Sequence, residues 1–424
     1  MMTMKTHYKR RDALKLMSGP LALVGLPWLA GCGGGGDDAE ELESIASSLL
    51  ATTAENQAAT FRHTDRLGPS RVIRRGASVQ PLPAHARSLA GLGYEHAGQR
   101  RTLDDYMQRN RCSGLLILKN GELALERYGM GNHAGTRWTS FSAAKSLTST
   151  LMGAALMDGS IASLDDPLTR YLPELAGSAY QANTLRELLR MCSGVAWNED
   201  YSQGADSDIA RLAQAWASGE RGAVMKLMGS RPRAAAPGSQ FCYSTGESYL
   251  LGAVVARATG STLSDYLSRK IWVPMGMEAD GYWMLDGVDG LEMGGNNFSA
   301  TLRDYARFGQ FFMQQGRIQG RAVLPSGWRD LAGHPDSAVT ACGQLYPGYP
   351  LGYGYQWWSF PDAAQALEPH NGAFTAEGIF GQFIYINPAE QVVAVVWSAW
   401  PQPWVDSAEL ETYALIGSTV AALR

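Results

Sequence analysis

The sequence predicts an α+β fold in which an antiparallel sheet is flanked by helices and carries a mostly helical inserted lobe. Two observations lead to this class. Pairs of apolar runs joined by short turns, as in β-hairpins, stand near residues 115–128 and 381–397 of the 424 residues. Between them, from Asp165 to about Trp358, lies a long stretch of helical and loop sequence without an internal repeat. Strands from both ends are therefore expected to share one sheet, with the helical sequence inserted between them.

The first hairpin has a strong turn signal. Two apolar runs, Leu115–Leu118 and Leu123–Tyr128, are joined through Asn120-Gly121. Asparagine and glycine tolerate the positive φ angles of a two-residue hairpin turn better than other residues. The sequence therefore predicts two adjacent antiparallel strands here.

The second hairpin and a final helix close the chain. Gly381–Ile386 and Gln391–Trp397 flank a turn at Asn387-Pro388-Ala389-Glu390, in which asparagine and proline are typical turn residues. Ser407–Leu423 is then expected to form a terminal helix.

Composition limits the possible partners. A hydrophobic content of 45% indicates a globular chain with a large core, in one domain with an inserted lobe or in two domains. The net charge is -4, and no arginine-rich stretch interleaves with aromatic residues later in the chain. A nucleic acid partner is therefore not expected, because binding to phosphates requires a basic surface.

Residues 1–32 are interpreted as an export signal with a lipobox. Arg10-Arg11 resembles the twin-arginine export pattern, and the apolar run Leu14–Leu29 is too short and too interrupted to span a membrane stably. Leu29-Ala30-Gly31-Cys32 looks like a bacterial lipobox, whose cysteine becomes the lipidated first residue. The protein is thus expected to be exported and anchored by lipid in the bacterial envelope, periplasmic or at the cell surface, with membrane contact through this anchor alone. A cleaved signal with an incidental cysteine remains the alternative.

Residues 33–100 are predicted to form a tether and an irregular extension, and residues 101–424 the folded domain, with its helical lobe within about 165–300. Four later cysteines are widely spaced, without a CxxC pair or a histidine at metal spacing. No metal and no cofactor are therefore expected. Both disulfides and buried thiols remain possible for these cysteines, and the sequence indicates no oligomeric state. They are Cys112, Cys192, Cys242 and Cys342.

The chemistry is predicted to centre on Ser142-Ala143-Ala144-Lys145. Residues three apart on a helix share a face, so the lysine amine can reach the serine hydroxyl. A desolvated lysine is neutral often enough to take the proton of a serine nucleophile. The run from Ser146 to Met157 is helix-like, and a serine at the start of such a helix also lies in its positive N-terminal field. An SxxK spacing alone is also common on solvated helix faces.

Two further segments give this motif a context. Tyr243-Ser244-Thr245 heads a helical pattern, and Gly378-Ile379-Phe380-Gly381-Gln382 opens the final strand pair. This order resembles the penicillin-recognising serine hydrolases of the class C β-lactamase-like group, and most of all the 6-aminohexanoate-dimer hydrolases and related carboxylesterases. The resemblance covers most of the chain after Leu115. Further segments match that family: Asp165-Asp166-Pro167, Tyr171–Leu175, Glu199-Asp200-Tyr201, Leu302–Gly309 and Gln356-Trp357-Trp358.

The resemblance implies a β-lactamase/transpeptidase-like fold and assigns the roles. By analogy with the family, Ser142 is acylated, Lys145 is its general base, and Tyr243 passes a proton to the leaving group. The backbone N–H groups of Ser142 and Ile379 hold the oxyanion, and Tyr201 binds the substrate. The lysine ammonium is expected to lower the pKa of the Tyr243 phenol.

Two segments differ from the β-lactamases, and these differences narrow the class of substrate that is expected. Ala376-Glu377-Gly378 stands where β-lactamases carry Lys-Thr-Gly, and Thr245 stands where they carry asparagine. His370 is interpreted as a satisfied, non-catalytic histidine. The leading hypothesis is therefore a serine hydrolase of a small-molecule ester or linear amide. A β-lactamase or D-amino-acid peptidase, and a non-catalytic envelope-binding lipoprotein, are the alternatives.

Overall fold

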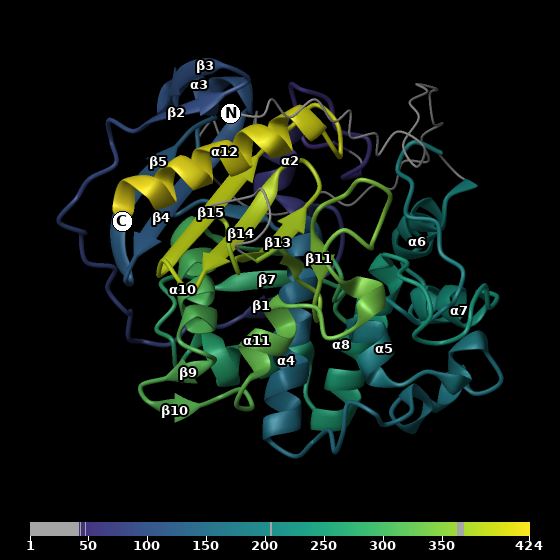
Figure 1. Ribbon diagram of the computed structural model, residues 1–424. Helices are drawn as coiled ribbons and strands as arrows, with labels where there is room; N and C mark the ends of the chain where they lie inside the picture. Colours follow the sequence, from purple (N-terminus) through teal and green to yellow (C-terminus); the bar gives the residue numbers. More distant parts are fainter. Residues whose placement is uncertain (1–41, 43, 47, 204–205, 363–368) are drawn as a thin grey trace.

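The structure is a computed structural model that describes residues 42, 44–46, 48–203, 206–362 and 369–424. Its main element is a seven-stranded antiparallel sheet with helices on both faces (Figure 1). The strands, in their order across the sheet, are β11 (Gly352–Tyr353), β12 (Trp358–Ser359), β13 (Phe374–Gly378), β14 (Gln382–Asn387), β15 (Val392–Ser398), β4 (Cys112–Lys119) and β5 (Glu122–Tyr128).

The two predicted hairpins meet in this sheet. β15 pairs antiparallel with β4, and Val395 lies opposite Leu116. In the first hairpin Asn120 and Gly121 have φ angles of +53° and +80°, the left-handed pair that a two-residue turn requires. Both hairpins and the joining of the chain ends in one sheet are confirmed.

The sheet is buried on both faces, and side chains along β4 alternate between two apolar clusters. Leu116 and Leu118 pack into the cluster shared with α4 (Ala144–Met157) and α10 (Leu302–Met313). Leu115 and Ile117 pack into the other, beside α12 (Asp406–Leu423), which Figure 1 shows crossing the sheet. The predicted terminal helix is therefore present, and it covers one apolar face of the sheet.

The inserted sequence forms a helical lobe, which Figure 1 shows beside the sheet in teal. The other helices are α2 (Gln57–Arg62), α3 (Leu103–Arg109), α5 (Leu185–Leu189), α6 (Asp208–Ala217), α7 (Ala223–Gly229), α8 (Thr245–Thr259), α9 (Leu263–Leu267) and α11 (Trp328–Gly333). Short helical turns are η2 (Thr64–Arg66), η3 (Phe141–Ala143), η4 (Leu168–Arg170), η5 (Pro173–Leu175), η6 (Ala179–Ala182), the π-helix η8 (Ser268–Trp272) and η9 (Ala338–Thr340). Within the described segments, no helix is both long and apolar enough to cross a bilayer.

Smaller sheets complete the fold. A four-stranded sheet has the order β1 (Ser70–Ile73), β7 (Gly281–Met284), β8 (Phe298–Thr301) and β6 (Arg137–Thr139). Two ribbons pair β2 (Gly93–His96) with β3 (Gln99–Thr102) and β9 (Arg317–Ile318) with β10 (Arg321–Ala322). The segment preceding the domain thus contributes α2 and β1 to the packed structure.

Two buried helices, α4 and α8, contact each other and carry the motif residues at their N-terminal ends. α4 follows directly on η3, and all residues of α4 from Ala144 to Ala155 are buried. α8 is capped by Ser244, whose hydroxyl accepts a hydrogen bond from the Glu247 N–H. The motif residues therefore stand on rigid elements.

Candidate active site

The structure brings Ser142 and Lys145 into contact. Ser142 lies on η3, and Lys145 lies in the first turn of α4. The Nζ of Lys145 is 2.9 Å from the Oγ of Ser142. Both side chains are buried, with exposed fractions of 1% for Lys145 and 7% for Ser142. The two side chains are therefore in contact, as predicted from their spacing of three residues.

Lys145 has hydrogen-bond partners for all three protons of an ammonium group. Besides Ser142, its Nζ donates to the Oγ1 of Thr245 and to the carbonyl oxygen of Gly295, each at 2.9 Å. Burial lowers the pKa of Lys145 from 10.5 to about 8, although the carboxylate of Glu199 raises it in part. At pH 7 roughly a tenth of the amine is therefore neutral, and the neutral form is the one that acts as a general base.

The ring of Tyr243 faces the amine of Lys145. The Nζ of Lys145 is 4.8 Å from the centroid of the Tyr243 ring, which stacks on Trp358 at 5.5 Å. Burial and then Glu199 raise the pKa of Tyr243 well above 10, although a hydrogen bond with Ser142 acts to lower it. The expected lowering of this pKa by the lysine is wrong, because burial is the largest influence on the Tyr243 phenol and raises its pKa. Tyr243 is thus a protonated phenol.

Glu199 and Thr245 connect Lys145 to a second polar layer, and the sequence did not assign them a role. The hydroxyl of Thr245 accepts from Lys145 and donates to Oε1 of Glu199, while the Thr245 N–H donates to Oε2 at 3.0 Å. Both residues stand in segments matched to the family, Glu-Asp-Tyr and Tyr-Ser-Thr. The available signal was Glu199 itself, an acidic residue two positions before the matched tyrosine Tyr201.

Tyr201 is connected to the site by a hydrogen bond to the carboxylate of Glu199. Its hydroxyl donates to Oε1 of Glu199 at 3.0 Å, and burial raises its pKa well above 10. The structure therefore places Tyr201 beside the Lys145 network, and its hydroxyl bonds a residue that is itself bonded to Thr245. Its role toward substrate stays a prediction.

The end of strand β13 brings Ile379 next to the nucleophile. Gly378, the last residue of β13, lies so close to η3 that a Cβ atom there would overlap the carbonyl oxygen of Ser140 and lie 3.1 Å from the Cβ of Phe141. Only glycine permits this approach. Ile379 follows directly, so its backbone lies beside the turn that carries Ser142. The assignment of its N–H as an oxyanion donor stays a prediction.

His370 lies apart from this site. Its Nε2 is 3.1 Å from the carbonyl oxygen of Tyr413, and its Nδ1 is 3.0 Å from the hydroxyl of Tyr385. A carbonyl only accepts, so Nε2 carries the proton and Nδ1 accepts from the tyrosine. Burial lowers the pKa of His370 to about 4. The interpretation as a satisfied, neutral histidine is confirmed.

Cysteines and acidic clusters do not provide metal chemistry in the described part of the chain. The four later cysteines are free thiols, and burial raises the pKa of each. No group of three or more His, Cys, Asp or Glu among the described residues is placed to hold a metal ion. Cys32 and the rest of the predicted signal lie outside the described residues.

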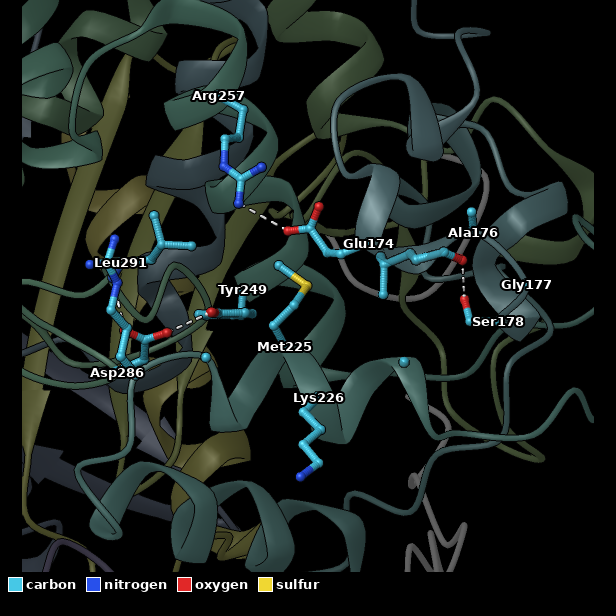
Figure 2. Close-up of a pocket in the computed structure, with 14 residues that line it drawn as sticks. Glu174, Ala176, Gly177, Ser178, Met225, Lys226, Tyr249, Arg257, Asp286 and Leu291 are labelled. Atoms are coloured by element: carbon cyan, nitrogen blue, oxygen red, sulfur yellow. Dashed lines mark hydrogen bonds and ion pairs between the residues drawn. The ribbon is translucent and has the colours of Figure 1, made fainter.

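A cavity of about 630 Å³ lies in the helical lobe, between η5, α7 and α8 (Figure 2). Two pairs of its polar groups bond each other, since Arg257 bonds Glu174 at 3.0 Å and Tyr249 bonds Asp286 at 2.7 Å. The predicted catalytic residues do not line it. A second cavity, of about 440 Å³, is lined by Phe241 and lies closer to the site, because both Phe241 and Tyr243 contact the Trp358 ring.

Comparison with known proteins places the chain in a family. The "Beta-lactamase" family model matches residues 100–418. The chain is 28% identical over 308 residues to the 6-aminohexanoate-dimer hydrolase of Paenarthrobacter ureafaciens, an alignment that covers 71% of this chain and 76% of the relative.

Solved structures share the fold at lower identity. A candidate 6-aminohexanoate-dimer hydrolase from Bacillus anthracis superposes with a TM-score of 0.78 at 23% identity, covering 90% of this chain and 97% of that protein. A hydrolase with promiscuous acyltransferase activity superposes with a TM-score of 0.60 at 18% identity, covering 74% and 96%. The fold and the family model therefore agree, and the chain belongs to the beta-lactamase family as a serine hydrolase of the β-lactamase/transpeptidase-like fold.

Proposed function

We propose that the protein cleaves an ester or a linear amide through an acyl-enzyme on Ser142. The observation that carries this proposal is the 2.9 Å contact between Ser142 Oγ and Lys145 Nζ, with the lysine pKa lowered to about 8. A hydroxyl becomes a nucleophile when a neighbouring base takes its proton. Here a buried amine is in place to do so.

Acylation uses two ionisable groups, Lys145 as the base and Tyr243 as the acid. Neutral Lys145 takes the proton of Ser142 as Oγ attacks the substrate carbonyl, and the N–H groups of Ser142 and Ile379 stabilise the oxyanion. The Tyr243 phenol, whose pKa is raised, then gives its proton to the leaving alcohol or amine. Lys145, now an ammonium 4.8 Å from the ring, stabilises the resulting phenolate and returns the proton to it.

Deacylation runs through the same groups. Water attacks the acyl carbonyl and gives a proton to neutral Lys145, and Lys145 passes that proton to the Oγ of Ser142 as the acid leaves. Thr245 and Glu199 hold the lysine amine in position throughout, since Thr245 both accepts from it and donates to Glu199.

An ester or linear amide is favoured over a β-lactam by the residues at the end of β13. β13 carries Ala376 and the buried Glu377, whose carboxylate accepts from the Tyr413 hydroxyl. The strand itself carries no lysine or arginine that could hold a substrate carboxylate. The P. ureafaciens relative, by its name, hydrolyses a 6-aminohexanoate dimer. The cavity at Phe241, which is lined by both apolar and polar side chains, offers space for part of the substrate.

The proposal is tested with p-nitrophenyl acetate and butyrate. The wild-type protein is expected to hydrolyse them, and Ser142→Ala is expected to lose at least about 10³-fold in kcat/KM. Full activity in that variant would end the proposal. Nitrocefin turnover matching the ester rate would favour the β-lactamase or peptidase alternative. Failure of a fluorophosphonate probe to label the protein would favour a non-catalytic binding lipoprotein.

We also propose export and lipid anchoring at Cys32, with Gly33–Gly36 as the start of a tether. Support comes from the sequence pattern alone. In cells expressing the full chain, the protein is expected in the detergent phase of a Triton X-114 partition, and Cys32→Ser is expected in the aqueous phase. An unchanged partition in that variant would remove the anchor.

A further inference from the structure

Two phenylalanines in a rare backbone conformation flank the two predicted oxyanion donors. Phe141 directly precedes Ser142 and has a φ angle of +44°, and Phe380 directly follows Ile379 and has a φ angle of +62°. Left-handed backbone is unfavourable for a bulky side chain and persists only where the surrounding structure holds it in place. Such strain is concentrated at functional sites, so the contacts that hold these residues bear on catalysis.

A third phenylalanine from the N-terminal segment packs on both. The rings of Phe141 and Phe380 have centroids 5.2 Å apart, and the ring of Phe61 lies 4.9 Å from the first and 5.3 Å from the second. Phe61 belongs to α2, has no exposed surface, and also meets Trp138 edge-on at 5.5 Å. These three residues, Phe61, Phe141 and Phe380, are called the phenylalanine cluster below.

Polar contacts fix α2 to the same part of the fold. The buried side-chain amide of Gln57 donates to the carbonyl oxygen of Trp400 at 2.9 Å, and the Trp400 N–H donates to the carbonyl oxygen of Phe380 at 3.2 Å. At the other end of the helix, Arg62 donates to the carbonyl oxygen of Met130 at 2.8 Å. α2 is thus tied both to the Phe380 turn and to the loop after β5.

We propose that Phe61 is a positioning residue for the oxyanion site, acting through the phenylalanine cluster. The inference rests on the proposed function, since it assumes that the N–H groups of Ser142 and Ile379 bind the oxyanion. The Phe61 ring packs against both strained residues. It thereby keeps the η3 turn and the end of β13 at a fixed distance from each other. Residues 57–62 lie before the part of the chain that the family model matches, so α2 completes a site built by that domain.

The chemical consequence concerns the transition state. Oxyanion donors accelerate a reaction because they already point to where negative charge develops. When Phe61 is shortened, the Phe141 and Phe380 turns are expected to relax, and the two N–H groups no longer converge. Substrate binding depends less on these donors, so the loss is expected in kcat rather than in KM.

The experiment compares Phe61→Leu with Phe311→Leu. Phe311 is a matched control, because it is also a fully buried helical phenylalanine among other rings, but it lies in α10. With p-nitrophenyl butyrate, Phe61→Leu is expected to lower kcat at least 10-fold with KM changed less than twofold. Phe311→Leu is expected to keep kcat within twofold, with both variants shown to be folded by circular dichroism.

A transition-state analogue gives a second readout. Phenylboronic acid forms a tetrahedral adduct with a catalytic serine and places a boron-bound oxygen in the oxyanion site. Its inhibition constant is expected to rise in Phe61→Leu by about the factor by which kcat/KM falls. Folded Phe61→Leu with wild-type kcat, or an equal kcat loss in Phe311→Leu, would overturn the inference. Activity retained in Ser142→Ala would instead show that the proposed function itself has failed.

Discussion

The Nζ of Lys145 lies 2.9 Å from the Oγ of Ser142, while the same nitrogen stands 4.8 Å from the ring centroid of Tyr243. Burial acts on the two ionisable groups in opposite directions, lowering the pKa of the lysine and raising that of the phenol. Each pKa shift favours the neutral form. The lysine is therefore suited to accept the serine proton and the tyrosine to donate one.

The pH profile is expected to follow Lys145. Its pKa is lowered to about 8, so the neutral amine becomes dominant above that value and kcat/KM is expected to rise with pH and level off beyond about 8. Glu199 raises this pKa. Glu199→Gln is therefore expected to move the midpoint of the profile to lower pH, as measured with p-nitrophenyl butyrate.

Glu174→Gln serves as the control for this shift, because Glu174 pairs with Arg257 in the helical lobe. It is expected to leave the midpoint unchanged. A midpoint in Glu199→Gln that stays in place or moves upward would exclude Lys145 as the titrating base.

Thr245 is expected to act through its hydroxyl. Thr245→Val keeps the shape but removes both the acceptor for Lys145 and the donor to Glu199. Loss of a hydrogen bond to a charged group corresponds to about 10-fold to 100-fold in kcat/KM. Thr245→Ser keeps the hydroxyl and is expected to stay within a few-fold of wild type. Equal rates in the valine and serine variants would show that the hydroxyl is not used.

Gly378 is expected to tolerate no side chain. In Gly378→Ala the new Cβ would overlap the Ser140 carbonyl oxygen, so β13 has to move away from η3. We expect a loss of at least about 10-fold in kcat and a destabilisation of about 1–3 kcal/mol, as for overpacking elsewhere. The control is Gly91→Ala, because Gly91 has open space around its Cβ position. Unimpaired kcat in Gly378→Ala would mean that the close approach has no part in catalysis.

His370 is expected to make the fold less stable in mild acid. Its pKa is about 4 in the folded protein and about 6.5 in an unfolded chain, so between these values the unfolded chain binds the additional proton. Stability is therefore lost as pH falls from 6.5 toward 4, by about 2 kcal/mol between pH 7 and pH 5. Urea unfolding at these two pH values measures it. His370→Gln cannot titrate, and its loss over this range should be smaller by that amount; an equal loss would assign the acid sensitivity to other groups.

Local sequence signals predicted the parts of the molecule that local rules determine. The turn at Asn120-Gly121 defined a hairpin, and the three-residue spacing of Ser142 and Lys145 placed their side chains in contact. The apolar runs of β4 and β15 indicated strands, and these two strands pair in the sheet.

Features that depend on distant residues were not predictable in this way. Thr245 and Glu199 form a hydrogen bond although 46 positions separate them, and no local sequence pattern predicts this contact. The raised pKa of Tyr243 depends on burial by the assembled lobe, so charge reasoning from Lys145 alone gave the wrong direction. The positive φ of Phe141 is likewise held by tertiary packing against Phe61 and Phe380.

The most direct test of the account is the mass of the enzyme during turnover. After rapid acid quenching of a reaction with p-nitrophenyl butyrate, intact-mass spectrometry is expected to show one added butyryl group, and peptide mapping to place it on Ser142. In Ser142→Ala the added mass should be absent. A butyryl group on another residue, or steady turnover by the Ser142→Ala variant, would contradict the account.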